Sequence, residues 1–163
     1  MEIKKAQIGD LDRLMVLYDL GRQFMRKNGN MDQWINGYPE REIVLEDIET
    51  GHCYTVWSEG RLAGVFAFFQ GKDVEPTYAE IQGAWLDDAP YGVVHRIASN
   101  GTAGGLVAAC CDWCLTQCSH LRIDTYKDNR PMRQALERYG FHYCGIITIG
   151  DGSERIAYQL NRD

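Results

Sequence analysis

The feature that most constrains this chain is a strand-like segment that passes through a glycine-rich turn into a helix. VVHRIAS (93–99) is the strand, NGTAGG (100–105) the turn and LVAACCDWCLTQC (106–118) the helix. Backbone N–H groups of residues 101–105 can approach an anion closely, and the helix N-terminus adds about half a positive charge. The segment predicts a site for a phosphate-bearing cofactor, although such a turn is also an ordinary connection.

A second unit of the same kind follows. LRIDTYKDN (121–129) has the pattern of a strand that ends in a turn, and PMRQALERYGF (131–141) that of a short helix. Pro131 suits the first helical turn, and Gly140 suits the C-terminal cap.

This arrangement resembles the GNAT superfamily of acyl-CoA-dependent N-acyltransferases. Asn129, with a Gly140–Phe141 pair eleven residues on, matches the family's pattern for this helix. In the family, the glycine loop holds the CoA pyrophosphate and the Asn helps to line the cofactor cleft. The resemblance implies one α/β (α+β) domain over residues 1–163, with a central mixed, mostly antiparallel β-sheet and helices on both faces.

The resemblance also implies a reaction. An acetyl group would move from acetyl-CoA to a primary amine of a small molecule or peptide by direct attack, with no metal and no covalent enzyme intermediate. Backbone groups of the segment 93–99, at Ile97 and Ser99, would hydrogen-bond the pantetheine arm. The implied cofactor-binding residues are Ile97, Ala98, Ser99, Gly101, Thr102, Ala103, Gly104, Gly105, Asn129, Met132 and Arg133.

Departures from the family pattern fall where chemistry would be assigned. The loop reads Gly-x-x-Gly-x-Leu and lacks the long polar residue that usually begins it. Leu136 stands where many members have a Tyr that protonates the departing thiolate, and Tyr139 is the nearest replacement. Because a thiol pKa is near 8.5, CoA can also leave without an assigned acid.

The strand-like segment 93–99 carries no carboxylate, but it does carry His95. His95 is the expected general base, because its unperturbed pKa suits proton transfer at neutral pH. Strand alternation predicts that His95 and Arg96 face opposite sides of the sheet, and Arg96 could pair with Asp124 on the next strand. A hydrogen-bonded structural role for His95 stays open. The alternatives, which would act through water, are Glu80, Asp87 and Asp88.

Two loop segments, 29–39 and 76–91, are rich in aromatic residues where polar loops are usual. In the family these regions cover the acceptor pocket, and aromatic rings supply shape to such pockets. They could equally fix long loops to the core. The predicted acceptor contacts are Gln33, Trp34, Tyr38, Tyr78 and Trp85.

A chain of 163 residues is about one domain in size, and its net charge of −6 argues against non-specific nucleic-acid binding. No stretch is apolar enough to span a bilayer and the N-terminus lacks a signal-peptide core, so we expect a cytoplasmic protein without membrane partners. An exposed terminal hairpin could pair across a homodimer.

Four of the six cysteines lie in one helical segment, with Cys110, Cys114 and Cys118 at four-residue spacing. Neighbours on one helix face pair poorly as disulfides, and a second metal-binding pair is missing. We expect buried, reduced thiols, with redox or metal roles as alternatives.

The remaining pattern predicts helices at 9–27 and 41–49 and hairpins at 53–69 and 143–160. Two other classes stay open. One is an acyl-CoA-binding sensor or interaction domain of the same fold without catalysis. The other is an unrelated nucleotide-binding α/β domain, which the two hairpins disfavour because they imply a mixed sheet.

Overall fold

The computed structural model describes residues 1–162 and contains one eight-stranded sheet in the order β1-β2-β3-β5-β6-β8-β7-β4. Only β5 and β6 run parallel, and all other neighbours are antiparallel. The strands are β1 (Glu2–Lys5), β2 (Cys53–Ser58), β3 (Arg61–Gly71), β4 (Gln82–Gly83), β5 (Tyr91–Ser99), β6 (His120–Thr125), β7 (His142–Thr148) and β8 (Glu154–Asn161). The predicted mixed, mostly antiparallel sheet is confirmed.

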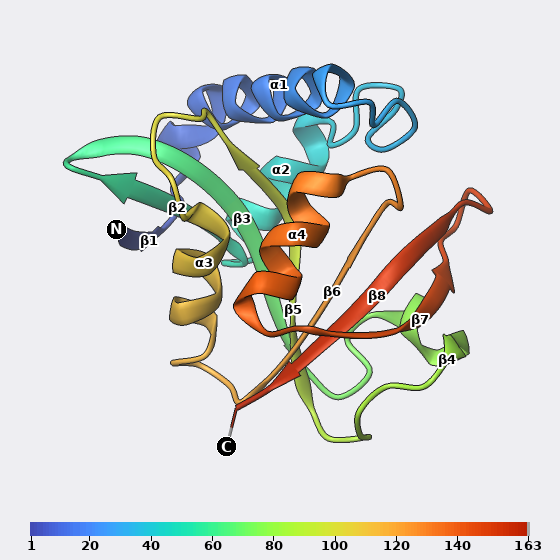
Figure 1. Cartoon of the computed structure of the whole chain (residues 1–163). Coiled ribbons are helices and arrows are strands. Elements are labelled where there is room, and N and C mark those ends of the chain that lie inside the picture. The colour runs from blue at the N-terminus through green and yellow to red at the C-terminus, as the bar shows by residue number, and fades with distance from the viewer. Residues whose placement is uncertain (163) are drawn as a thin grey trace.

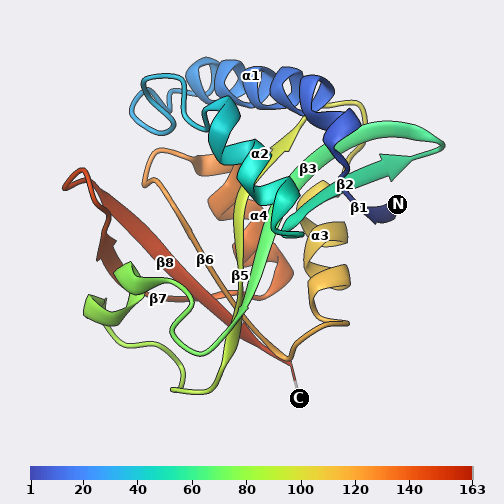
Figure 2. The ribbon, with the colours of Figure 1, turned by 180° about the vertical axis from the view of Figure 1, so that it is seen from behind.

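Helices cover both faces of the sheet, as the sequence predicted. In Figure 1, α3 (Leu106–Cys114) and α4 (Arg130–Tyr139) lie in front of the strands. In Figure 2, seen from behind, α2 (Arg41–Glu49) lies in front, and α1 (Leu11–Lys27) runs along the top; both pack on this face of the sheet. Two short 3-10 helices, η1 (Ile8–Asp10) and η2 (Pro76–Glu80), complete the set. The α2 bounds match the prediction, whereas α3 ends at Cys114 rather than continuing to Cys118.

Apolar residues form three buried clusters. The largest lies between the sheet and the α3–α4 layer and includes Phe66, Cys110 and Leu136. A second lies under α1 and α2, and a third packs around Tyr78 and Tyr91 beneath η2. All six cysteines are free thiols, and burial raises the pKa of the Cys111 thiol to about 12. The helical cysteines therefore pack as apolar groups.

The terminal hairpin differs from the expectation in one respect. Its second strand, β8, pairs with β6 on one side and β7 on the other, so it lies inside the sheet. Only β7 presents an outer edge, and β4 covers part of that edge. β8 therefore offers no free edge to a second copy, and pairing of the terminal hairpin across a homodimer, which stays a prediction, would have to use β7.

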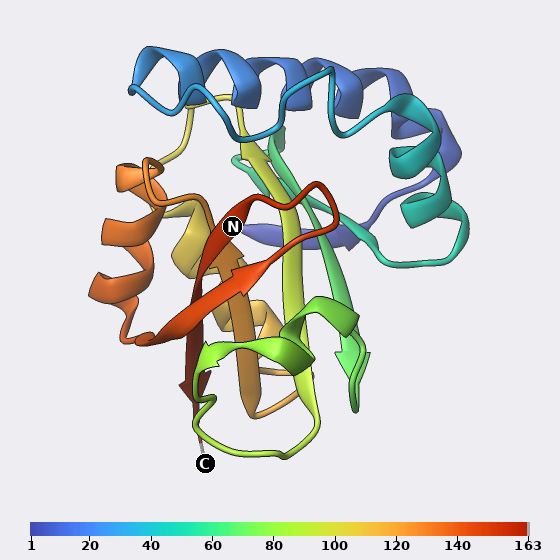
Figure 3. The same cartoon turned by 90° about the vertical axis from the view of Figure 1, so that its right-hand side faces the viewer.

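Two irregularities in β5 prepare the site. Its ladder with β3 shifts between Val65 and Ala67, and Arg96, opposite this shift, has φ of 50°, so one extra residue bulges from the strand. Pairing between β5 and β6 covers only Gly92↔Leu121 and Val93↔Arg122. Beyond these pairs the two strands diverge toward α1 (Figure 1; Figure 3 gives the side view), which opens the sheet.

Candidate active site

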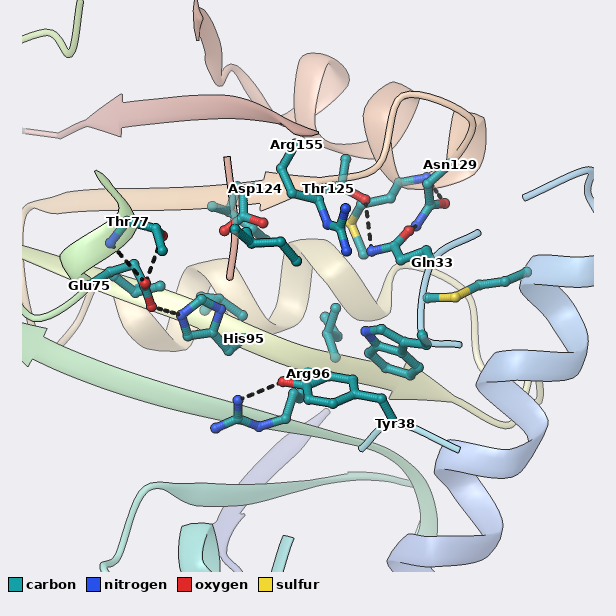
Figure 4. A pocket seen from close by; sticks show the side chains of 18 of the residues that line it. Gln33, Tyr38, Glu75, Thr77, His95, Arg96, Asp124, Thr125, Asn129 and Arg155 are labelled. Carbon is teal, nitrogen blue, oxygen red and sulfur yellow. Dashed lines mark hydrogen bonds and ion pairs between the residues drawn. The ribbon is translucent and has the colours of Figure 1, made fainter. Parts of the chain in front are cut away.

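An acceptor cavity of about 650 Å³ lies on the α1–α2 side of the sheet, where β5 and β6 diverge. Its walls come from the loop between α1 and α2, from β5 and β6, from the segment before η2 and from the β7–β8 hairpin. Figure 4 shows polar side chains from all these segments pointing into one space. We call this space the acceptor cavity, following the expectation for the region.

His95 and Glu75 form a pair inside this cavity. His95 Nε2 lies 3.0 Å from a Glu75 carboxylate oxygen, and the other oxygen accepts hydrogen bonds from the Thr77 hydroxyl at 2.7 Å and the Thr77 backbone N–H at 3.3 Å. The hydrogen bond to His95 contributes most to lowering the pKa of Glu75, to about 2. Glu75 thus stays ionised and orients the imidazole ring, leaving Nδ1 able to accept a proton. The sequence analysis missed Glu75 because no spacing links it to His95.

The predicted pairing of Arg96 with Asp124 is wrong. Arg96 donates two hydrogen bonds, each of 2.7 Å, to the buried carboxylate of Asp47 on α2. Burial alone would lower the pKa of Arg96, but the bonds to Asp47 raise it above its usual value. Tyr18 donates a hydrogen bond of 2.8 Å to the Arg96 carbonyl oxygen. These hydrogen bonds join the bulge at Arg96 to both α1 and α2.

The bulge also overturns the expected alternation on β5. His95 pairs with Ala67 and Ala98 with Val65, so both side chains lie on the α1–α2 face of the sheet. Arg96, at the extra residue, reaches the same face through Asp47, and both His95 and Arg96 line the acceptor cavity. An extra residue shifts the two-residue period by one, and the sequence pattern could not show this.

Three of the five predicted acceptor contacts, Gln33, Trp34 and Tyr38, line the acceptor cavity. Gln33 is buried and joins its loop to the sheet, accepting a hydrogen bond from Asn129 at 3.1 Å and lying 3.5 Å from the Thr125 hydroxyl. The Tyr38 hydroxyl accepts from Arg96 at 3.1 Å. This loop therefore serves both as wall and as structural link.

Tyr78 and Trp85 do not line the cavity. Tyr78 is fully packed in the third core cluster, and its hydroxyl donates a hydrogen bond of 2.6 Å to Asp124. Trp85 packs on Tyr78 and on the guanidinium of Arg122. Asp124 itself does line the cavity, so Tyr78 acts on the site through it. The predicted direct contact of Tyr78 and Trp85 with an acceptor has no support in this arrangement.

A second cavity of about 520 Å³, the donor cavity, lies on the opposite side of the gap, between the end of β5, the start of α3 and α4. Of the predicted cofactor residues, those that line it are Ile97, Ala98, Ser99, Gly101, Gly105, Asn129 and Met132. Thr102, Ala103, Gly104 and Arg133 do not, and Arg133 instead donates to the Tyr158 hydroxyl at 3.1 Å.

The start of α3 is open toward this cavity. Gly105 caps the helix with φ of 73°, a left-handed conformation that favours glycine, and provides no side-chain cap. The first backbone N–H groups of α3 therefore lack an intrahelical acceptor. Two loop N–H groups are already used, because Gly101 donates to Ser99 Oγ and Thr102 to Asn100 Oδ1. The backbone N–H groups without an acceptor thus include those at the helix start, whereas the beginning of the loop uses its own.

Tyr139 lines the donor cavity from α4, and Leu136 is buried in the core. The Tyr139 hydroxyl donates a hydrogen bond of 2.6 Å to Asp112 on α3. Burial and this bond raise the pKa of Tyr139 to about 12. Its proton is therefore held firmly in the ligand-free structure.

The two cavities share four lining residues: Met25, Ile97, Asn129 and Met132. A molecule in one cavity can thus meet a molecule in the other between the diverging strands. One cavity offers an uncapped helix start and the other a histidine–carboxylate pair. This is the arrangement expected of a protein that transfers a group between two bound molecules.

Comparison with known proteins agrees with that class. The family model "Acetyltransferase (GNAT) family" matches residues 17–141. A crystal structure of a GNAT-family acetyltransferase from Streptococcus agalactiae is 32% identical, with a TM-score of 0.87 over 99% of this chain and 95% of that chain. The chain therefore belongs to the GNAT acetyltransferase family.

More distant structures share the fold. An acetyltransferase from Listeria monocytogenes is 20% identical, with a TM-score of 0.68 over 99% of this chain and 94% of that chain. A ribosomal-protein-alanine N-acetyltransferase from Brucella melitensis is 16% identical, with a TM-score of 0.61 over 99% and 100% of the two chains. No curated protein sequence matches this chain.

Two findings concern other site types. Among residues 1–162, no three His, Cys, Asp or Glu side chains are grouped so that they could hold a metal ion. Within the same residues, no helix is both long and apolar enough to cross a membrane.

Proposed function

We propose that this chain, as a single domain over residues 1–163, is an N-acetyltransferase that moves an acetyl group from acetyl-CoA to a primary amine of a small molecule or peptide. The observation that carries the proposal is the junction of the two cavities at Ile97, Asn129 and Met132, with the His95–Glu75 pair on the acceptor side. Family membership supports acyl transfer in general.

The donor cavity fits acetyl-CoA. Apolar side chains such as Ile97, Leu106 and Met132 suit the pantetheine arm, and backbone groups of β5 beyond Val93 have no partner in the described β5–β6 ladder. The uncapped start of α3 suits the pyrophosphate. Arg138, which lines the same cavity, could meet a further phosphate. When bound, acetyl-CoA supplies the thioester carbonyl that an amine attacks, exchanging a carbon–sulfur for a carbon–nitrogen bond.

His95 is the proposed general base. An alkylammonium with a pKa near 10 must lose a proton before its nitrogen can attack. Nδ1 of His95 takes up this proton, directly or through water, while Glu75 holds the ring and stabilises the imidazolium that forms. Positioning of the two substrates across the gap supplies much of the remaining acceleration.

Tyr139 remains the candidate acid for the departing thiol. Its hydroxyl lies at the donor cavity, but it must give up its hydrogen bond to Asp112 to act. Because a thiolate is a good leaving group near neutral pH, we assign Tyr139 a minor contribution.

The test has two parts. Thermal unfolding is first measured with acetyl-CoA, CoA and ATP, where a ligand at about 100 times its dissociation constant adds roughly 2.7 kcal/mol of stability. Stabilisation by both CoA compounds but not by ATP identifies the cofactor. Thiol release is then followed with a panel of amines. CoA binding without thiol release from any amine would favour a non-catalytic acyl-CoA sensor, and no binding would reject the proposal.

A cytoplasmic location remains a prediction, supported by six free thiols in the described chain. A homodimer is likewise only a prediction, and an interface through β8 is not part of it.

A further inference from the structure

Arg155 occupies an unusual position for a cation. It lies on β8 in the inward-facing row that also holds Ala157, and its partner across the ladder is Ile147. Both of these apolar neighbours are fully buried, and Arg155 itself is only 8% exposed. The row ends at the acceptor cavity, which Arg155 lines. The same row continues with the buried amide of Gln159 and with Asn161, and Arg155 is its one charged member.

Arg155 forms no ion pair with a carboxylate among the described residues, although Asp151 lies near it in the cavity wall. Its Nη1 donates to the Ser153 hydroxyl at 2.9 Å and to the Glu154 carbonyl oxygen at 3.1 Å, and its guanidinium lies 5.3 Å from the centre of the Tyr126 ring. All three partners are neutral. Among the described residues no carboxylate forms an ion pair with it, and Asp151 on the same hairpin is exposed and bonded to Ser153.

Arg96, the other arginine that lines the cavity, differs from Arg155 because a carboxylate of the protein neutralises its charge. Asp47 accepts two hydrogen bonds from it, and Tyr38 accepts a third. Arginine stays protonated in proteins, so a buried guanidinium must be paired or pay for its lost hydration. Arg96 is paired by the protein itself. For Arg155, a bound ligand could supply this counter-charge.

Figure 4 shows the Arg155 guanidinium directed into the cavity, between Asp124 on one side and Gln33 and Thr125 on the other, with His95 on the opposite strand. The planar fork of a guanidinium matches a carboxylate, which it can bind through two parallel hydrogen bonds. Beside His95, the Glu75 carboxylate supplies negative charge that suits an ammonium group. The cavity therefore has opposite charges at two places.

We infer that the acceptor is an amine that also carries a carboxylate, as in a free amino acid, and that Arg155 binds this carboxylate while the amine faces the His95–Glu75 pair. This inference rests on the proposed acetyl transfer and names the substrate class of the same site. Arg155 is then a specificity-determining residue and takes no part in proton transfer.

Matched acceptors test the inference. Thiol release from acetyl-CoA is measured with common L-amino acids, each beside its carboxamide and its decarboxylated amine. At least one amino acid is expected to react, and to do so with a kcat/KM about 30-fold or more above that of its carboxamide, since removal of one partner of a buried charge pair has effects of this size.

Variants assign the preference to Arg155. Arg155→Gln raises the KM for the preferred amino acid by about 30-fold and leaves the rate with its carboxamide within about 3-fold. Arg155→Lys recovers part of the loss, because it keeps the charge but not the fork. Arg61→Gln, at an exposed position on β3, is the matched control and changes neither rate. If Arg155→Gln fails to fold, the acid–carboxamide comparison in the native protein still decides.

Thermal unfolding without acetyl-CoA separates the two proposals. The preferred amino acid raises the midpoint of the native protein more than its carboxamide does, and this difference disappears in Arg155→Gln. If the midpoint behaves so but no acceptor releases thiol, the carboxylate site stands and the transferase proposal fails. Transfer to amides and amines as fast as to acids, with no change in Arg155→Gln, overturns the inference and keeps the transferase.

Discussion

The two cavities that meet between β5 and β6 are built from different materials. The donor cavity is formed mainly by backbone and apolar side chains, with an uncapped helix start as its polar end. The acceptor cavity also has apolar walls, but several charged side chains project into it. His95 is paired with Glu75 inside the cavity, and Arg96 is paired with Asp47 behind its wall. One cavity suits a molecule recognised by shape and phosphate. The other suits a molecule recognised by individual charges, so single substitutions should act more strongly there.

The largest effect is expected at the acceptor pair. His95→Ala removes the proposed base and should lower kcat/KM for the amine by about 100-fold or more. Glu75→Gln should lower it less, because the imidazole remains but loses its orienting carboxylate. Steady-state thiol release measures both.

His120→Ala is the matched control for this prediction. His120 also contacts a carboxylate, with its Nε2 3.3 Å from Asp87, but it lines neither cavity. Its loss should leave transfer within about 2-fold of the native rate, well below the effect of a general base. Equal losses in His95→Ala and His120→Ala would remove the case for His95 as base.

The next effect concerns the pair that holds the bulge. Asp47→Asn leaves the buried Arg96 without its counter-charge and should lower the free energy of unfolding by about 3 kcal/mol. Asp12→Asn is its control, since Asp12 on α1 also pairs with an arginine, Arg41 on α2, but at the surface. That change should cost less than about 1 kcal/mol. Urea unfolding measures both, and similar losses would show that burial of the pair is unimportant.

The donor side should respond through backbone strain rather than charge. Gly105→Ala forces a left-handed φ on a residue with a side chain, which costs about 1 to 2 kcal/mol. Gly104→Ala, one residue earlier, has free space around the added methyl group and no positive φ, so its cost should be near zero. Equal stability of the two variants in thermal unfolding would contradict the assigned role of Gly105.

Acid should weaken the acceptor pair in a defined range. The pKa of Glu75 is near 2 in the folded protein and about 4.3 in an unfolded chain, so its stabilisation is complete above the higher value and lost as pH falls toward the lower. The difference in unfolding free energy between native protein and Glu75→Gln, at most about 3 kcal/mol at pH 6, should shrink between pH 4.3 and 2. Glu49→Gln, at an exposed position, should show no such change.

The same contrast explains what the sequence could predict. The donor residues Ile97 to Ser99 and Gly101 are close in sequence and their pattern matches a known family, and the structure brings them together in one cavity. The acceptor pairs join residues 20 and 49 positions apart, and no periodicity relates such residues. A one-residue bulge at Arg96 then reversed the expected side of the sheet.

Aromatic content was a poor guide for a related reason. Rings fill a core and line a pocket by the same apolar contacts, so composition could not separate Trp34 at the cavity from Tyr78 in the core. Arg155 left only a weak signal, since it shares one face of β8 with Ala157 and Gln159, and the sign of a special role is its burial, which is uncommon for an arginine. That signal depends on knowing which face of β8 is covered, and the order of strands in the sheet supplies this.

The smallest effect is expected at Tyr139, and it sharpens the comparison most. If the donor side works by shape and backbone, Tyr139→Phe should change kcat by less than about 3-fold, because a thiolate leaves readily and the hydroxyl is bonded to Asp112. Because the pKa of Tyr139 is about 12, its hydroxyl stays protonated below pH 10, and its deprotonation should not change kcat in that range. A 100-fold loss in Tyr139→Phe, with CoA binding unchanged, would instead place an acid in the donor cavity and make both cavities depend on individual side chains.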